Sequence, residues 1–184
     1  MPDPLARLLR ENVQPPPGRG GWHGGPTPLG ALRGVSAEQD AWTPAPGRKS
    51  IWQLTLHIAY WKYAVRRRLE GGAAGPETTG RGSFPRAPSN WPRVPAGADA
   101  AAWRADVALL KAEHERLVET IAAIPVARYG ETLPGGKRWA VGELILGIAQ
   151  HDAYHTGQIQ MLKRLWTAVG PAGKAAGRRR GRPE

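Results

Sequence analysis

The sequence contains no cysteine among its 184 residues. This absence excludes disulfide bonds, zinc–thiolate sites and cysteine nucleophiles, so any metal or catalytic chemistry must use other side chains. No stretch reaches the roughly 18 apolar residues that a membrane-spanning helix needs. Residues 1–7 also lack the charged-then-apolar layout of a secretory signal. We therefore expect a soluble, cytoplasmic protein.

Acidic residues are scarce: there are 15, against 26 lysines and arginines, and the formal net charge is +11. Residues 170–184 carry +4 of this charge in a setting of glycine, alanine and proline without apolar periodicity. That composition predicts a disordered basic tail following a single domain over residues 1–169. The other basic residues are scattered, and no aromatic residues alternate with them as in a nucleic-acid-binding surface. Binding to nucleic acid is therefore the least favoured of the functions considered.

Apolar periodicity at three- and four-residue spacing predicts three long helices. Ser50 with Gln53 forms a capping-box pattern, Asp99 can cap a second helix, and Glu143 favours the start of a third. The expected helical segments are 5–13, 27–32, a start at 36–39, 50–71, 99–124 and 140–169. A connection rich in glycine and proline covers 71–97. We predict an all-α protein: a four-helix bundle with long irregular loops.

Two histidines stand out on the last of these helices. His151 and His155 are four residues apart, so both imidazoles project from one face and can reach one divalent ion. Both fall on the predicted apolar stripe of that helix, with Val141, Leu144, Ile148 and Leu162. His57 lies on the flank of the stripe of the 50–71 helix and can also reach the interior. Spacing alone leaves two readings open: a metal site, or buried histidines that are hydrogen-bonded to carbonyls and to Asp152.

Two segments resemble the signature helices of the DinB/YfiT-like superfamily: Ser50–Trp61, which contains His57, and His151–Ile159. Trp22-His23-Gly24, Asn90-Trp91-Pro92 and the helix of Trp103 also resemble sequences of that superfamily, and the likeness covers about residues 20–165. It implies a four-helix bundle, a homodimer, and a nickel- or zinc-type ion held by His57, His151 and His155.

The superfamily includes thiol-dependent transferases and isomerases that use bacillithiol or mycothiol, as well as metal-dependent hydrolases. The resemblance thus implies an enzyme whose metal activates water or a low-molecular-weight thiol against a small-molecule substrate. Fold alone does not choose between hydrolase and transferase. The alternative is a bundle that binds a metal or a ligand without catalysis.

Four further residues are candidates for the pocket or its surroundings. His114 occupies a core position on its helix, where we expect a structural role. Asp152 points about 100° away from His151 and could anchor a ligand histidine of a neighbouring helix. Tyr154 and Gln158 neighbour the histidine pair and could line the pocket. His23, in a glycine-rich loop, is expected to pack or cap, and no residue is assigned as the general base.

Overall fold

The computed structural model describes residues 3–21, 24–71, 84–88, 90–133 and 138–170. In these ranges every extended regular element is a helix, and the β pairing consists of an isolated antiparallel bridge between Thr132 and Ala140. The helices are α1 (Pro4–Val13), α2 (Pro28–Ala31), α3 (Ala37–Ala41), α4 (Ile51–Gly71), α5 (Ala100–Ala123), the 3-10 helix η1 (Val126–Gly130) and α6 (Val141–Val169). The prediction of an all-α protein is confirmed. None of these helices combines the length and apolar character that crossing a membrane requires.

The predicted helix starts are confirmed in the hydrogen bonds. The backbone N–H of Gln53 donates to Ser50 Oγ at 3.2 Å, and that of Ser50 donates to Gln53 Oε1 at 3.1 Å. The Asp99 carboxylate accepts from the first free N–H groups of α5. The Glu143 carboxylate accepts from the N–H of Ala140, just before α6. These side chains satisfy backbone donors that have no partner inside the helix, and so fix where each helix begins.

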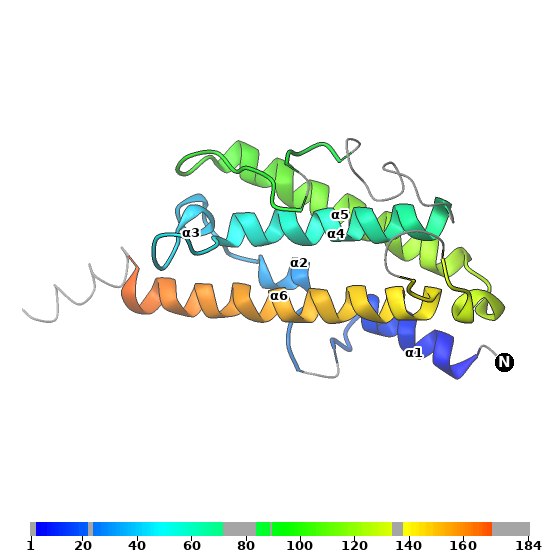
Figure 1. Ribbon diagram of the computed structural model, residues 1–184. Coiled ribbons are helices and arrows are strands. Elements are labelled where there is room, and N and C mark those ends of the chain that lie inside the picture. Colours follow the sequence, from blue (N-terminus) through cyan, green and yellow to red (C-terminus); the bar gives the residue numbers. More distant parts are fainter. Residues whose placement is uncertain (1–2, 22–23, 72–83, 89, 134–137, 171–184) are drawn as a thin grey trace, which may run out of the picture.

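The three long helices lie alongside one another, and α4 contacts both α5 and α6. In Figure 1, α4 and α6 run side by side across the molecule in opposite directions, and α5 passes behind α4 at an angle. The shorter α1 packs against α6 and α5, and α2 packs against α6. Helices α4 and α6 therefore face each other, which is the pairing that the predicted metal site requires.

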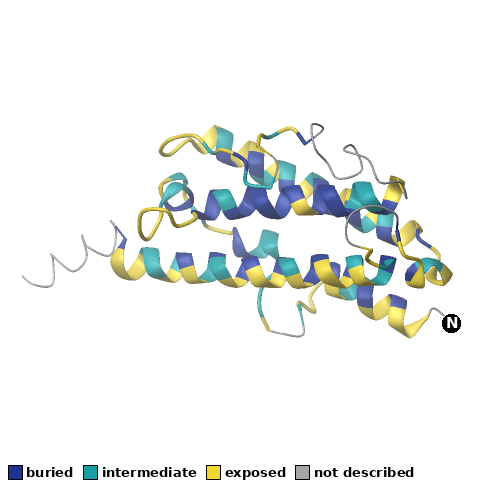
Figure 2. Ribbon diagram, in the orientation of Figure 1, coloured by how far each residue is buried: buried dark blue, intermediate teal, exposed yellow. Residues whose placement is uncertain are grey.

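Helix α4 is the central element of the core. Fourteen of its 21 residues are buried, and Figure 2 shows it as the most continuously buried ribbon. One apolar cluster gathers around Trp52, Leu56 and Ile159. A second gathers around Leu117 and Ile145, and includes the apolar face of α1. Burial of these side chains supplies most of the favourable free energy of folding.

The buried face of α6 is wider than predicted. Leu144 and His151 are only half-buried, whereas Asp152 and Thr156 are buried. The reason is that α6 contacts α4 on one side and α1 and α2 on another, so that apolar periodicity marks only part of the covered surface. On α4, Trp61 follows the three- and four-residue spacing of the buried Leu54, Ile58 and Val65 but is itself 37% exposed.

Three predictions fall outside the described residues. The predicted basic tail covers residues 170–184, of which 171–184 are not described. The same holds for Trp22 and His23, and for residues 72–83 of the long connection. Of that connection, residues 84–88 and 90–97 are described and are irregular, as predicted.

Candidate metal centre

The structure brings His57 of α4 together with His151 and His155 of α6. One ring nitrogen from each histidine lies within 4.8 Å of the others. The Nε2 atoms of His57 and His151 are 3.1 Å apart. Neighbouring ligand nitrogens about 2.0–2.1 Å from a tetrahedral ion are separated by about 3.3 Å, so this distance suits a shared ion. The group could therefore hold a divalent metal.

A loop residue sets the orientation of His57. The Nδ1 atom of His57 lies 2.6 Å from the backbone carbonyl oxygen of Asn90. A carbonyl can only accept, so Nδ1 donates and Nε2 of the neutral ring keeps its lone pair. The side-chain oxygen of Asn90 accepts from Trp61 Nε1 at 2.9 Å. Asn90 has a φ of 73°, in the left-handed region that asparagine tolerates better than most residues.

Trp91 covers the other side of His57. Its ring stacks on the imidazole with centroids 3.8 Å apart and planes 7° apart. The ammonium group of Lys49 lies over Trp91, 4.6 Å from the ring centroid. Trp91 therefore lies directly on the histidine cluster, where it restricts the rotation of His57.

His155 is oriented from its own helix. Its Nδ1 lies 2.7 Å from Gln158 Oε1, one turn further along α6. An amide oxygen accepts, so Nδ1 of His155 donates and its Nε2 is left to bind. The exposed Tyr154 ring packs edge-on against the His155 ring at 4.9 Å. Both neighbours predicted for the site, Tyr154 and Gln158, thus contact His155.

Burial keeps the three imidazoles neutral. Desolvation lowers the pKa of His57 to about 4, against the hydrogen bond to Asn90, which raises it. Desolvation also lowers the pKa of His151 to about 3, with smaller contributions from His155, His57 and Lys62. The pKa of His155 is lowered by the same cause, partly offset by Gln158. A neutral imidazole is the form that binds metal ions.

The donor set fits a first-row divalent ion. Three neutral imidazole nitrogens suit zinc, nickel or copper, whereas magnesium and calcium require mainly oxygen ligands. Two of the three rings have the second nitrogen hydrogen-bonded, as is usual for metal-ligating histidines. The Nδ1 atom of His151 is buried and makes no hydrogen bond within the described residues. Three protein ligands leave coordination positions open for water or substrate.

Two cavities flank the histidine cluster along α6. One, of about 560 Å³, is lined by His155, Tyr154, Gln158 and Trp91, with Arg48 and Lys49. The other, of about 440 Å³, is mostly apolar and is lined by His151, Trp61, Trp139 and Leu146. The cluster is therefore reachable from two sides.

Asp152 does not anchor a ligand histidine. Its Oδ2 accepts from the ammonium group of Lys62 on α4, and both side chains are buried. The structure therefore corrects this prediction: the side chain does point away from His151, but it meets a lysine. Burial raises the pKa of Asp152, and Lys62 opposes that shift. No sequence pattern marked Lys62 as buried, because lysine side chains are usually solvent-exposed.

His114 lies outside the metal-ligand group. It is buried on α5, where its Nε2 is hydrogen-bonded to Gln14 Oε1, just after α1. Desolvation lowers its pKa to about 4, assisted by the charge of Lys62. These contacts agree with the structural role expected for His114. Asn90 is the site residue that sequence reasoning missed, although the Asn90-Trp91-Pro92 motif contained it.

Comparison with known proteins is consistent with this site. Searches of curated proteins and of solved structures gave no match. The model of the DinB superfamily matches residues 28–159. This span takes in α2 to α6 as far as Ile159, with His57, His151 and His155. The chain therefore belongs to the DinB superfamily.

Proposed function

We propose that this protein is a metal-dependent enzyme in which His57, His151 and His155 hold a divalent ion, nickel or zinc. The observation that carries the proposal is the convergence of the three rings, two of which are held by Asn90 and Gln158 with the metal-binding nitrogen free. A group oriented in advance by its surroundings binds without further loss of side-chain entropy. When bound, the ion would lower the pKa of a water or thiol at its open position.

The residues around the cluster indicate what kind of substrate the site would bind. Arg48 and Lys49 line the larger cavity next to His155 and would favour a small anionic molecule. Trp91 offers a flat apolar surface in the same cavity, and its stacking on His57 limits access of water from that side. These residues would bind and orient the substrate beside the open coordination position.

The presence of two cavities favours a thiol-dependent transferase over a hydrolase. A transferase must admit two organic molecules to one centre, whereas a hydrolase admits one and water. The described lining of the larger cavity also contains no carboxylate that could serve as a general base, and the carboxylate of the smaller one, Glu143, accepts from the N–H of Ala140 at the start of α6. A thiol needs less help than water to lose its proton, since its unperturbed pKa is near 8.5. Formation of a homodimer remains a prediction from the superfamily resemblance.

Elemental analysis of the untagged full chain tests this proposal. We expect close to one nickel or zinc ion per chain, and none in the His151→Ala, His155→Ala double variant. His114→Ala is the matched control, because His114 is a buried histidine outside the group and its loss should leave the metal in place. A parent chain that contains no metal and takes up none of either ion would refute the site.

Activity is then measured on the metal-loaded chain with electrophilic substrates, each with and without a low-molecular-weight thiol. Turnover that requires the thiol supports the transferase, and turnover without it supports a hydrolase. A fully loaded protein that turns over no substrate under either condition would leave a non-catalytic metal-binding bundle.

A further inference from the structure

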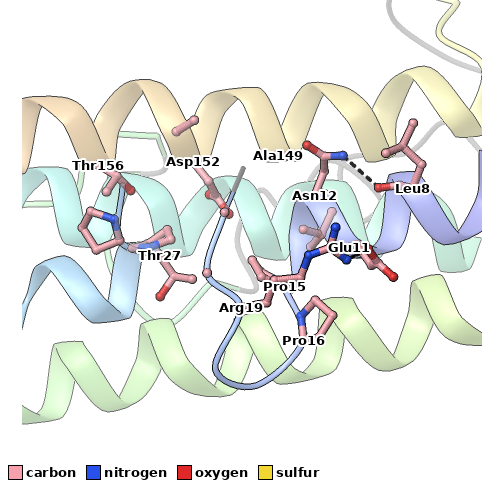
Figure 3. Close-up of a pocket in the computed structure, with 16 residues that line it drawn as sticks. Leu8, Glu11, Asn12, Pro15, Pro16, Arg19, Thr27, Ala149, Asp152 and Thr156 are labelled. Atoms are coloured by element: carbon pink, nitrogen blue, oxygen red, sulfur yellow. Dashed lines mark hydrogen bonds and ion pairs between the residues drawn. The ribbon is translucent and has the colours of Figure 1, made fainter. Parts of the chain in front are cut away.

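A third cavity, of about 400 Å³, lies on a different face of α6 from the metal-ligating histidines. It is enclosed by α1, by the connection from α1 to α2, and by Ala149, Asp152, Ala153 and Thr156 of α6. In Figure 3 the loop of Pro15, Pro16 and Arg19 lies below α6, on the side toward which Asp152 extends. Successive helical residues differ in direction by about 100°, so this face of α6 is separate from that of His151.

Two residues of this lining each carry a buried oxygen atom that has no hydrogen-bond partner among the described residues. The two atoms are Oδ1 of Asp152 and Oγ1 of Thr156. Asp152 is 5% exposed and Thr156 is 3% exposed. The residues are four apart on α6, so their side chains project one turn apart on one face. In Figure 3 both extend from α6 toward the cavity. A buried polar atom without a partner costs free energy, which a bound group would recover.

The charges around the cavity limit what can bind. The second oxygen of Asp152 is paired with the Lys62 ammonium group, so these two charges already compensate one another. At the rim, Arg19 and Glu11 form an ion pair at 3.1 Å. A charged ligand would therefore bring an uncompensated charge into a low-dielectric site, which is unfavourable. A neutral ligand carries no such cost.

A hydroxyl group meets the hydrogen-bonding requirement of the two free oxygens. Its O–H can donate to Asp152 Oδ1, while its oxygen accepts from the hydroxyl of Thr156. The rest of the lining is mixed: Leu8, Val13 and the methyl groups of Ala149 and Ala153 offer an apolar surface, whereas Glu11, Asn12 and Arg19 are polar. The volume is at the lower end of the range for small-molecule sites, and suits a compact, ring-sized body.

We propose that this cavity binds a small neutral alcohol with an apolar body, held by Asp152 and Thr156 and separate from the metal centre. The probe is cyclohexanol, with cyclohexylammonium and cyclohexanecarboxylate as matched cationic and anionic controls. The full chain is titrated with each while the backbone amide signals of α6 are followed by NMR. We expect cyclohexanol to give saturable shifts around Ala149, Ala153 and Thr156, and to bind more tightly than either charged control.

Two variants locate the site. Ala153→Leu places a larger side chain in the cavity from an exposed helical position, and should abolish the cyclohexanol shifts without unfolding the chain. Thr156→Val removes the hydroxyl at nearly constant shape, and should weaken binding about fivefold, as expected for one neutral hydrogen bond. Unchanged affinity in both variants would overturn the proposal, as would tighter binding of cyclohexylammonium. No saturable shift with any probe would show that only water occupies the cavity, and would likewise overturn it.

Discussion

Lys62 connects α4 to α6 through a buried ion pair, and its replacement by methionine tests how far that pair determines the packing of the two helices. The lysine side chain is 1% exposed and that of Asp152 is 7% exposed, so neither charge is screened by solvent. Removing one partner leaves the other as an uncompensated buried charge, which costs about 3–5 kcal/mol in known cases. For a chain of this length, 1 kcal/mol corresponds to roughly 2–4 °C in Tm. Lys62→Met should therefore lower the Tm by roughly 6–20 °C.

The measurement is urea and thermal unfolding of the full chain, with the same substitution at an exposed ion pair as the control. Lys111 and Glu115 lie 3.7 Å apart, with side chains that are 64% and 58% exposed. Lys111→Met should change the free energy of unfolding by no more than about 0.5 kcal/mol.

A double-variant cycle separates the ion pair from general packing. Lys62→Met with Asp152→Leu replaces both charges by apolar groups, and should recover most of the stability lost in Lys62→Met alone. If Lys62→Met costs no more than Lys111→Met, the reasoning is refuted. If the double variant loses more unfolding free energy than the two single variants lose in sum, the two charges do not stabilise each other.

Two further predictions concern the metal centre and a buried acid. Gln158→Ala removes the acceptor that orients His155 and should lower metal affinity about 10–100-fold, measured by competition with a chromophoric chelator. The control is Gln150→Ala, at an exposed position of the same helix. Equal metal affinities in the two variants would contradict the role of Gln158. Asp40 is fully buried, and desolvation raises its pKa to about 7, with Glu38 adding to the shift. The folded state therefore holds a proton on Asp40 that the unfolded state has released between pH 4 and 7, so the contribution of Asp40 to stability should fall as pH rises through this window, by at most about 1.4 kcal/mol per pH unit. The histidines with lowered pKa, namely His57, His114, His151 and His155, make stability rise over the same range, so the contribution of Asp40 is measured as a difference between two proteins. Urea unfolding at pH 5 and 7 should show the parent losing stability relative to Asp40→Asn as pH rises; a difference that does not change with pH would exclude a proton held by Asp40.

The sequence by itself determined the helices and much of the candidate site. Caps at Ser50 and Asp99 act within one turn of chain, so their residue types mark the helix starts directly. The four-residue spacing of His151 and His155 places both rings on one face, because it follows from helical periodicity alone. The position of His57 on its helix allowed it to reach the interior, and the superfamily resemblance then supported it as the third ligand.

Only the tertiary structure decided what meets these residues. His57 reaches His151 because α4 and α6 pack in one particular register, and Asn90 reaches His57 from a loop 33 residues away in the chain. Lys62 and Asp152 lie 90 residues apart in the sequence and form an ion pair, although no apolar pattern marks either residue. Periodicity reports which side of a helix is covered, but it carries no information about the partner that covers it. Burial of a charged residue depends on that partner, and therefore on the packing of the whole chain.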